Sequence, residues 1–345
     1  MHIVVLCGGL YPERDVSIAS GRQIARSLID RGHQVLLMDL FFGYTEPYTN
    51  PLATFDNALA RVPATLASTA PDLAAIRASR PGNDPSPIGP GVFDLCRAAD
   101  IVFMALHGED GENGKLQAAF DLAGIRYTGS GAFGSALAMH KGVSRTLFMS
   151  AGIDVPHGQV VLQDDSDVLG VVRYPCVVKP CSGGSSVATT IVKNPADLFD
   201  ALDQVFRVDT EALIEDYIPG REFSVGVLDG AALPVIEICP KSGFFNYENK
   251  YQPGMTEEIC PAALSEAEAL HMQEAAVRAH AVLHLEVYSR TDFILSESGK
   301  LYCLETNTLP GMTPTSLLPQ EAAAAGFDFG YLCEEILTIS MRKYQ

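Results

Sequence analysis

Acidic and amide side chains recur at one place near the C-terminal end of the chain. Glu305 and Asn307 are two residues apart in a strand-like run, so they project from the same face. The turn "SESGK" predicts a hairpin that brings Asp292 to within about one register step of Glu305. Two carboxylates and an amide oxygen on one face, next to Arg290, form a ligand set suited to Mg²⁺. A solvated polar face with a salt bridge is the alternative interpretation, and this stretch alone leaves both open.

A second candidate lies mid-chain, in "YPCVVKPCSGGSSVATTIV". Two runs rich in β-branched residues flank a loop containing Gly183, Gly184, Ser185 and Ser186, and Lys179 stands at its entrance. Successive glycines allow backbone N–H groups to point inward as an anion-binding nest, and a lysine adds a point charge for phosphate. A surface hairpin with a solvated lysine explains the stretch equally well. A Walker A loop is excluded, because G-x-x-x-x-G-K-[ST] is absent from the sequence.

Three further patterns carry less information. The segment "ALIEDYIPGREFSV" could offer backbone groups to a purine edge and a carboxylate to a ribose, but many strand–turn–strand segments look similar. The G-x-G-x-x-G match "GSGAFG" lies late in the first predicted domain, so we interpret it as a helix-entry turn instead of a dinucleotide site. His280 and His284 have helical spacing without the glutamate of a zinc motif, and we expect core or surface histidines.

The elements that must position these residues begin with a βαβ unit: "HIVVLCGG", a helix ending at Gly32, and "QVLLMDL". Residues 43–91 are rich in Pro, Ala and Asn and read as an insertion or lid edge, with a short helix at "DLAAIRAS". A strand then ends at His107, and one helix is predicted over "SALAMHKGVSRTLFMSAG". Strands dominate residues 160–240, apart from a helix starting near Asn194, the expected N-cap. A long amphipathic helix, the acidic hairpin and a final helix complete the chain.

Composition narrows the class of protein. The 345 residues are 47% hydrophobic and carry a formal net charge of −18, which argues against binding to nucleic acid or anionic membranes. The eight cysteines form no C-x-x-C pair, and several lie in apolar runs, as buried thiols do in a reducing compartment. Neither a signal peptide nor an 18-residue apolar span is recognisable, so we expect a cytoplasmic protein without a membrane partner.

Taken together, these motifs resemble one family, the D-alanine–D-alanine ligases of the ATP-grasp fold. The resemblance covers nearly the whole chain except residues 43–91, and the order and spacing of the motifs make it specific. The matching segments are "GGLYPERDVS", "ALHGEDGENGKLQ", "YTGSG", "HK" at His140-Lys141, "VVKPCSGGSSV", "LIEDYIPGREFSV", "YENKY", "SRTDF" and "LETNTLPGMTPTSL".

The resemblance implies roles for individual positions. It places the ATP phosphates on Lys141 and Lys179 with Lys250 near the γ-phosphate, the adenine on Glu215, Asp216, Tyr217 and Ile218, and the ribose on Glu222. It makes Asp292, Glu305 and Asn307 ligands of two Mg²⁺ ions, with Mn²⁺ as a substitute. It assigns Arg290 and the Gly311 N–H to the tetrahedral intermediate, and Glu13 to the first D-alanine's ammonium with Ser185 and Tyr251 as partners in closing the site. His107 would line the first substrate pocket, and Ser316 and Leu317 the second.

The fold and reaction follow from the same resemblance. It implies an α/β protein, α+β in the ATP-grasp part, with an N-terminal parallel-sheet domain over 1–128 and two ATP-grasp subdomains over 129–217 and 218–345. The expected reaction joins two D-alanine molecules through an acylphosphate, for peptidoglycan precursor synthesis in the bacterial cell wall. The family also predicts a homodimer.

Rival functions remain at this stage. They are a sister ligase that makes D-Ala-D-Ser or D-Ala-D-lactate, another ATP-grasp carboxylate–amine ligase, and a catalytically silent nucleotide-binding protein. Lys250 and Tyr251 favour the dipeptide, because that tyrosine position is altered in depsipeptide-forming relatives.

One departure from the family pattern stands out. Ala188 occupies a position where the phosphate loop of the family often has glycine, so a positive φ there would strain the loop or change its closure.

Overall fold

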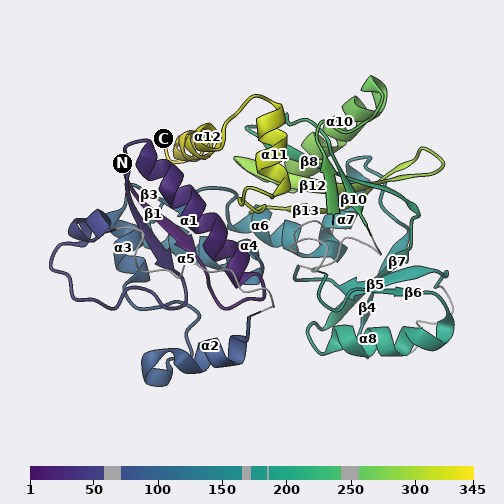
Figure 1. Ribbon diagram of the computed structural model, residues 1–345. Coiled ribbons are helices and arrows are strands. Elements are labelled where there is room, and N and C mark those ends of the chain that lie inside the picture. The colour runs from purple at the N-terminus through teal and green to yellow at the C-terminus, as the bar shows by residue number, and fades with distance from the viewer. Residues whose placement is uncertain (58–70, 165–171, 185, 242–255) are drawn as a thin grey trace.

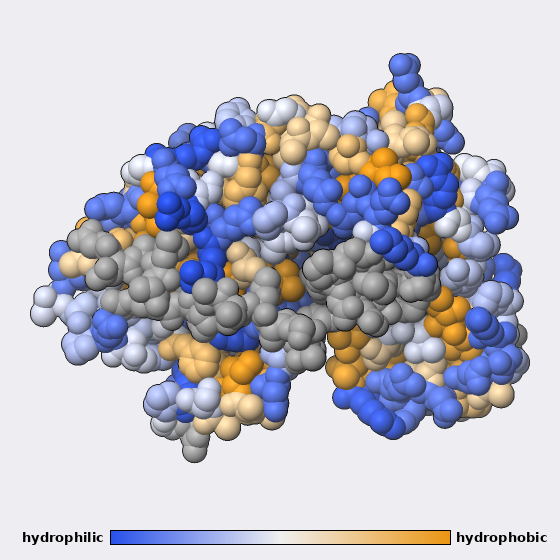
Figure 2. All heavy atoms as spheres, in the orientation of Figure 1, coloured by the Kyte–Doolittle hydropathy of each residue, from blue (hydrophilic) through white to orange (hydrophobic). Residues whose placement is uncertain are grey.

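The computed structural model describes residues 1–57, 71–164, 172–184, 186–241 and 256–345. Within these ranges the chain forms three sheets, with helices packed against them (Figure 1). The described helices include none that is long and apolar enough to cross a membrane. On the face drawn in Figure 2, apolar residues occur in small groups among hydrophilic ones, which is ordinary for a folded protein surface.

The first sheet is parallel, with strand order β2–β1–β3. It contains β1 (His2–Cys7), β2 (Gln34–Asp39) and β3 (Ile101–Met104), and α1 (Arg14–Asp30) connects the first two strands. The predicted βαβ unit is therefore confirmed. The C-terminal helix α12 (Phe329–Arg342) returns to pack beside α1, and an Arg31–Asp328 ion pair of 2.9 Å joins the two regions. This packing brings the two chain ends close together (Figure 1).

The described parts of residues 43–91, which are 43–57 and 71–91, contain only short helical elements. Their elements are η1 (Pro51–Asn57), α2 (Leu73–Ser79) and η2 (Pro81–Asn83), followed by α3 (Val92–Ala98). The helix predicted at "DLAAIRAS" is α2, whose N-cap Asp72 accepts a hydrogen bond from the Ala75 N–H at 3.0 Å. Leu73 of this helix borders a large cavity described below, so the insertion contributes to the wall of the site.

The second sheet is antiparallel, with order β4–β7–β5–β6, and α8 (Leu198–Phe206) covers one face. Its strands are β4 (Gly158–Leu162), β5 (Cys176–Pro180), β6 (Thr190–Val192) and β7 (Glu211–Asp216). The hairpin β5–β6 places Lys179 at the end of β5, just before the Gly/Ser loop, as predicted. Asn194 caps the turn η4 (Pro195–Asp197) that leads into α8, which agrees with the predicted N-cap.

The third sheet has order β11–β10–β8–β12–β13, with β9 (Ala231–Ala232) beside β8. Its strands are β8 (Gly220–Leu228), β10 (Ile236–Pro240), β11 (Thr256–Ile259), β12 (Tyr288–Ser296) and β13 (Leu301–Asn307). One face carries the apolar side chains of Val225, Val227 and Phe293, which pack against α6 (Ala132–Met139), α7 (Lys141–Ser150) and α10 (Glu266–Val282). The other face carries Ser224, Gly226, Arg290 and Asp292, because side chains alternate along a strand.

The helix α11 (Leu317–Ala324) packs on this second, polar face of the third sheet. A Cβ atom at Gly226 would lie 2.6 Å from Leu318 Cδ1 and 2.7 Å from Glu321 Oε2, so a larger residue there would displace these two side chains of α11. The sequence reasoning did not predict α11 as a separate helix. The two short helices α4 (Glu109–Glu112) and α5 (Lys115–Ala123) complete the first part of the chain, after β3.

The single helix predicted over residues 135–152 is wrong. The structure has two helices, α6 and α7, which meet at His140, where φ is −90° and ψ is 99°. The His140 side chain caps α7 by accepting a hydrogen bond from the Val143 N–H at 3.2 Å. The break has a functional consequence, because it makes Lys141 the first residue of a helix and directs it toward the Gly/Ser loop.

The predicted domain boundaries at 128/129 and 217/218 stay predictions. The change from the second to the third sheet does fall between β7 and β8. However, α6 and α7, which belong to the predicted central unit, pack on the third sheet.

Candidate active site

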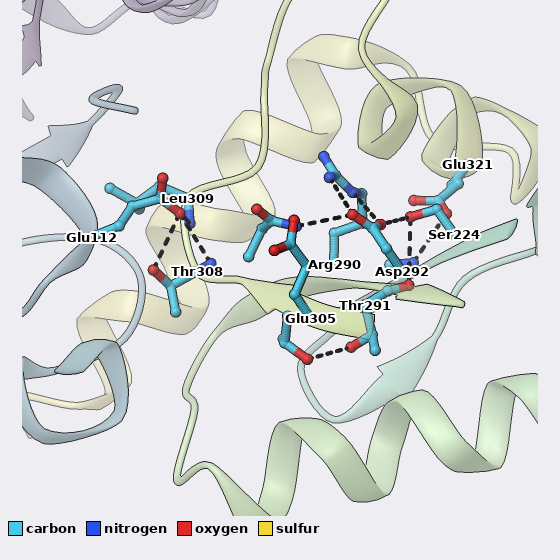
Figure 3. Close-up of polar contacts among 12 residues, drawn as sticks. Glu112, Ser224, Arg290, Thr291, Asp292, Glu305, Thr308, Leu309 and Glu321 are labelled. Carbon is cyan, nitrogen blue, oxygen red and sulfur yellow. Dashed lines mark hydrogen bonds and ion pairs between the residues drawn. The ribbon is translucent and has the colours of Figure 1, made fainter. Parts of the chain in front are cut away.

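The acidic hairpin brings Asp292 to Glu305 within the one register step that was predicted, with a β-bulge between Asp292 and Phe293. Asp292 of β12 lies directly opposite Glu305 of β13, and Arg290 lies opposite Asn307. Figure 3 shows the Glu305 side chain on the same side of the hairpin as Arg290 and Asp292, whereas Thr291 points to the other side. The structure therefore brings together the four side chains that sequence spacing singled out.

Asp292 is the centre of this group. Its carboxylate is buried and accepts hydrogen bonds from Arg290 at two positions, both 2.9 Å, from the Ser224 hydroxyl at 2.6 Å, and from the Asn307 amide N–H at 3.2 Å (Figure 3). Burial alone would lower the pKa of Arg290, but the Asp292 carboxylate outweighs it and holds that pKa above its ordinary value. The two hydrogen bonds between the Arg290 guanidinium and the Asp292 carboxylate hold both side chains in one geometry.

Two lysines approach the hairpin from different elements. Lys179 of β5 is buried and forms a 2.5 Å ion pair with Glu215 of β7. Burial alone would lower the pKa of Lys179, but Glu215 and Glu305 outweigh it and raise that pKa. Lys141 donates a 2.7 Å hydrogen bond to the Gly183 carbonyl, and its Nζ lies 3.4 Å from Glu305 Oε2. Positive charge is thus held beside the Gly/Ser loop.

Two cavities meet at this point. The larger has a volume of about 480 Å³ and is lined by Lys179, Asp292 and the segment Glu215, Asp216, Tyr217, Ile218 and Glu222. The smaller, of about 110 Å³, is lined by Glu13, His107, Arg290, Asn307, Gly311, Ser316 and Leu317. Among the described residues, four line both cavities: Lys141, Gly183, Gly184 and Glu305. The larger volume is in the range of small-molecule sites, and the shared wall would allow a group bound in one cavity to react with a group in the other.

The smaller cavity draws its walls from distant parts of the chain. Glu13 directly precedes α1, and Gly311 and Ser316 belong to the loop that follows β13. In that loop the Thr313 N–H donates to the Ser316 hydroxyl at 3.0 Å, which folds it back on itself. A Cβ atom at Gly311 would lie only 2.7 Å from Ser316 Oγ, so a side chain there would disturb this turn.

His107 links the first sheet to the same loop. Its Nδ1 lies 3.0 Å from the Leu309 carbonyl, which can only accept, so Nδ1 carries the proton. Its Nε2, 3.1 Å from Ser20 Oγ, then accepts, and the Ser20 hydroxyl in turn accepts from the Met312 N–H at 3.3 Å. Burial lowers the pKa of His107, which favours this neutral form. We interpret His107 as a neutral side chain whose hydrogen bonds position the loop that follows β13.

Glu112 has a comparable part that the sequence reasoning missed. Its carboxylate accepts hydrogen bonds from the N–H groups of Thr308 (3.2 Å) and Leu309 (2.9 Å), and from the Gly108 N–H at 2.9 Å (Figure 3). Burial raises the pKa of Glu112 to about 7. The available signal was a run of acidic residues directly after His107, but nothing local identified a partner almost 200 residues away. The strand predicted to end at His107 is β3, which ends at Met104.

Three predicted site residues, Ser185, Lys250 and Tyr251, lie outside the described residues. Every other predicted site residue lines one of the two cavities.

The Gly/Ser loop contains the departure noted in the sequence. Ala188 has φ of 52°, in the left-handed region that favours glycine. An alanine there costs about 1–2 kcal/mol, although glycine has a larger unfolded-state entropy to lose.

We therefore expect Ala188→Gly to raise the free energy of unfolding by about 0.5–1 kcal/mol, measured by urea titration. Ala263→Gly is the matched control, because Ala263 lies in an exposed loop and is not among the residues with positive φ. It should lower the stability by a similar amount. A loss of stability in both variants would show that Ala188 carries no strain.

Comparison with known proteins gives a consistent result. Residues 2–130 match the family model described as "D-ala D-ala ligase N-terminus", and residues 147–338 match "D-ala D-ala ligase C-terminus". The chain is 42% identical to a D-alanine–D-alanine ligase of Lacticaseibacillus casei, with 100% of this chain and 97% of that protein covered. It is 39% identical to one from Pediococcus pentosaceus, with 100% and 99% covered.

Solved structures agree in fold. The crystal structure of D-alanine–D-alanine ligase from Bacillus anthracis complexed with ATP is similar, with a TM-score of 0.76, 28% identity, and 99% and 98% of the two chains covered. The VanG D-Ala:D-Ser ligase from Enterococcus faecalis is similar with a TM-score of 0.76, 27% identity, and 98% and 99% covered. Backbone similarity therefore does not separate the two kinds of second substrate.

Proposed function

This chain belongs to the D-alanine–D-alanine ligase family, and on that premise we propose that it joins two D-alanine molecules in an ATP-dependent reaction that releases ADP and phosphate. The observation that carries the proposal is the pair of cavities that share Lys141, Gly183, Gly184 and Glu305. One cavity has the size and the lysines for a nucleotide, and the other has the carboxylate, guanidinium and hydroxyl that amino acids require. The product would be a building block for peptidoglycan.

The chemistry explains why two cavities must meet. A carboxylate is a poor electrophile, so the γ-phosphoryl group is first transferred to the carboxylate of one D-alanine. The bond from the γ-phosphorus to the ADP oxygen breaks, and a bond to the carboxylate oxygen forms. The second D-alanine loses its ammonium proton, and the resulting amine attacks the acyl carbon. The bond from the acyl carbon to the phosphate oxygen then breaks, phosphate leaves with the electron pair, and a second proton leaves the nitrogen as the amide forms. Neither step requires a covalent bond to the protein. The main task of the protein is to position the reacting groups and to stabilise the charge that develops.

Residues of this chain fit the individual tasks. Lys141 and Lys179 would bind the phosphates, and the segment from Glu215 to Ile218 with Glu222 would hold adenine and ribose. Glu13 would receive the ammonium of the first D-alanine. Arg290 and the Gly311 N–H would stabilise the oxyanion formed during the second step, where one well-placed donor contributes about 3–4 kcal/mol. The Gly/Ser loop would exclude water that could hydrolyse the acylphosphate.

The acidic hairpin fits divalent cations. Asp292, Glu305 and Asn307 present carboxylate and amide oxygens on one sheet face, which is the ligand chemistry that Mg²⁺ prefers. The contacts from Ser224 and Arg290 to Asp292 orient that carboxylate in the way that supporting contacts orient metal ligands. When bound, Mg²⁺, or Mn²⁺ in its place, would neutralise the negative charge of the phosphates. We propose that these three residues hold it.

The expected homodimer and the cytoplasmic location remain predictions of the family resemblance. The dipeptide is favoured over D-Ala-D-Ser, because the full-length relatives reported above at 39–42% identity are D-alanine–D-alanine ligases.

The test is phosphate release by the purified protein with ATP and Mg²⁺, with D-alanine alone and then with D-serine or D-lactate added. We expect release with D-alanine alone, accompanied by the mass of the dipeptide. Release that requires D-serine or D-lactate, with a mixed product, would contradict the proposed second substrate. ATP binding without release under any of these conditions would contradict the reaction.

A further inference from the structure

Glu258 lies in the smaller cavity, although no motif drew attention to it. It belongs to β11, the edge strand of the third sheet, and pairs with Ile238 of β10. It lines the cavity together with Arg290, Ser316 and Leu317. Its neighbour Glu257 is exposed to solvent, as the alternation of side chains along a strand requires. One of two adjacent glutamates therefore faces the reaction site.

The position of Glu258 is fixed by Gln320 of α11. The Gln320 side-chain amide donates one hydrogen bond to the Glu258 carboxylate and another, of 3.2 Å, to the Thr315 carbonyl. Glu258 is thereby tied to the loop that precedes Ser316, which is the part of the cavity proposed for the second substrate. Burial raises the pKa of Glu258 above its ordinary value, and this effect outweighs the opposite effect of Arg290.

Within the described residues, the hydrogen-bond donor to the Glu258 carboxylate is neutral, so no cationic side chain donates a hydrogen bond to it. Gln320 is neutral, and the guanidinium of Arg290 is already engaged by both oxygens of Asp292. A partly buried carboxylate with a neutral partner is costly unless a ligand brings a positive group to it. An amino acid is a zwitterion, so its carboxylate would suit the side of Ser316 and Leu317, and its ammonium would suit Glu258.

We propose that Glu258 binds the ammonium group of the second D-alanine and so selects an amine, in preference to a hydroxy acid, as the acceptor. The proposal for the first D-alanine uses a separate carboxylate, Glu13, which lines the cavity from the segment between β1 and α1. The two acidic side chains come from different walls, so each substrate can have its own. The inference depends on the proposed ligase function.

Glu258→Gln tests this with little disturbance of shape, because glutamine still accepts the hydrogen bond from Gln320. The protein receives ATP, Mg²⁺ and D-alanine together with hydroxylamine, a small neutral nucleophile that also attacks the acylphosphate. The ratio of D-alanyl-D-alanine to D-alanine hydroxamate is then measured by mass. A hydrogen bond between charged groups is worth enough that the ratio should fall about tenfold or more in the variant. Both products draw on the same acylphosphate, so the ratio isolates acceptor recognition.

Glu257→Gln is the matched control, with the same chemical change one residue away on the solvent side, and it should keep the wild-type ratio. An unchanged ratio in Glu258→Gln, including a parallel loss of both products, would overturn the inference, because a structural role lowers both alike. Hydroxamate without any dipeptide from the wild-type protein would instead contradict the proposed function and remove the premise.

Discussion

Replacing Glu305 by glutamine is expected to abolish turnover while the fold stays intact. Glu305 lines both cavities, and its Oε2 lies 3.4 Å from Lys141 Nζ. Glutamine has nearly the same shape but no negative charge, so it is a much weaker ligand for a divalent cation. Loss of several kcal/mol of charge stabilisation lowers kcat by at least about a thousandfold. The measurement is phosphate release with ATP and D-alanine over a titration of Mg²⁺.

Glu297→Gln provides the control for this experiment. Glu297 is exposed in the turn of the same hairpin and lies outside both cavities, so its variant should turn over at the wild-type rate. Urea unfolding of the two variants should agree to within about 1 kcal/mol, since substitutions of exposed or partly exposed charges rarely cost more. Unchanged activity in Glu305→Gln would remove the metal assignment from this hairpin.

The hairpin illustrates how far the sequence alone can lead. A strand repeats every two residues and a short turn limits the register, so spacing alone places Asp292 within about one register step of Glu305. Their direct opposition also depends on a β-bulge between Asp292 and Phe293, which the spacing does not predict. The position of Lys179 before a glycine-rich loop is equally local. Both patterns lie within single hairpins, and both predictions agree with the structure.

Contacts between distant segments could not be predicted in this way. The bond from the Leu309 N–H to Glu112 spans 197 residues, and its existence depends on how the first and third sheets pack together. The break at His140 was missed because the apolar spacing runs through it, and the side-chain cap that ends one helix and begins the next leaves the periodicity unchanged. Glu258 was missed for a related reason: one glutamate in "TEEI" differs from its neighbour only by the face it occupies.

The paired hydrogen bonds between Arg290 and Asp292 allow the effect of geometry at position 290 to be tested separately from the effect of positive charge. Lysine at position 290 would keep the positive charge but could not form the two-pronged contact of 2.9 Å and 2.9 Å with Asp292. Asp292 would lose its orientation, and the oxyanion would lose a preorganised donor. We expect Arg290→Lys to lower kcat about a hundred- to a thousandfold, measured by phosphate release at saturating D-alanine. ATP affinity, measured by titration calorimetry, should change far less, because Arg290 lines the smaller cavity.

Arg221 offers a matched comparison for that variant. It forms the same two-pronged contact with Glu237, at 2.7 Å and 2.7 Å, on the same sheet but outside both cavities. Arg221→Lys therefore removes an equivalent fork without touching the site, and it should leave kcat unchanged. If both variants lost kcat to the same extent, the effect would come from weakening the sheet. If neither did, charge alone would suffice at position 290, and the oxyanion would depend on other donors, such as the Gly311 N–H. A loss confined to Arg290→Lys is what we expect, because orientation of a donor matters most where charge develops during the reaction.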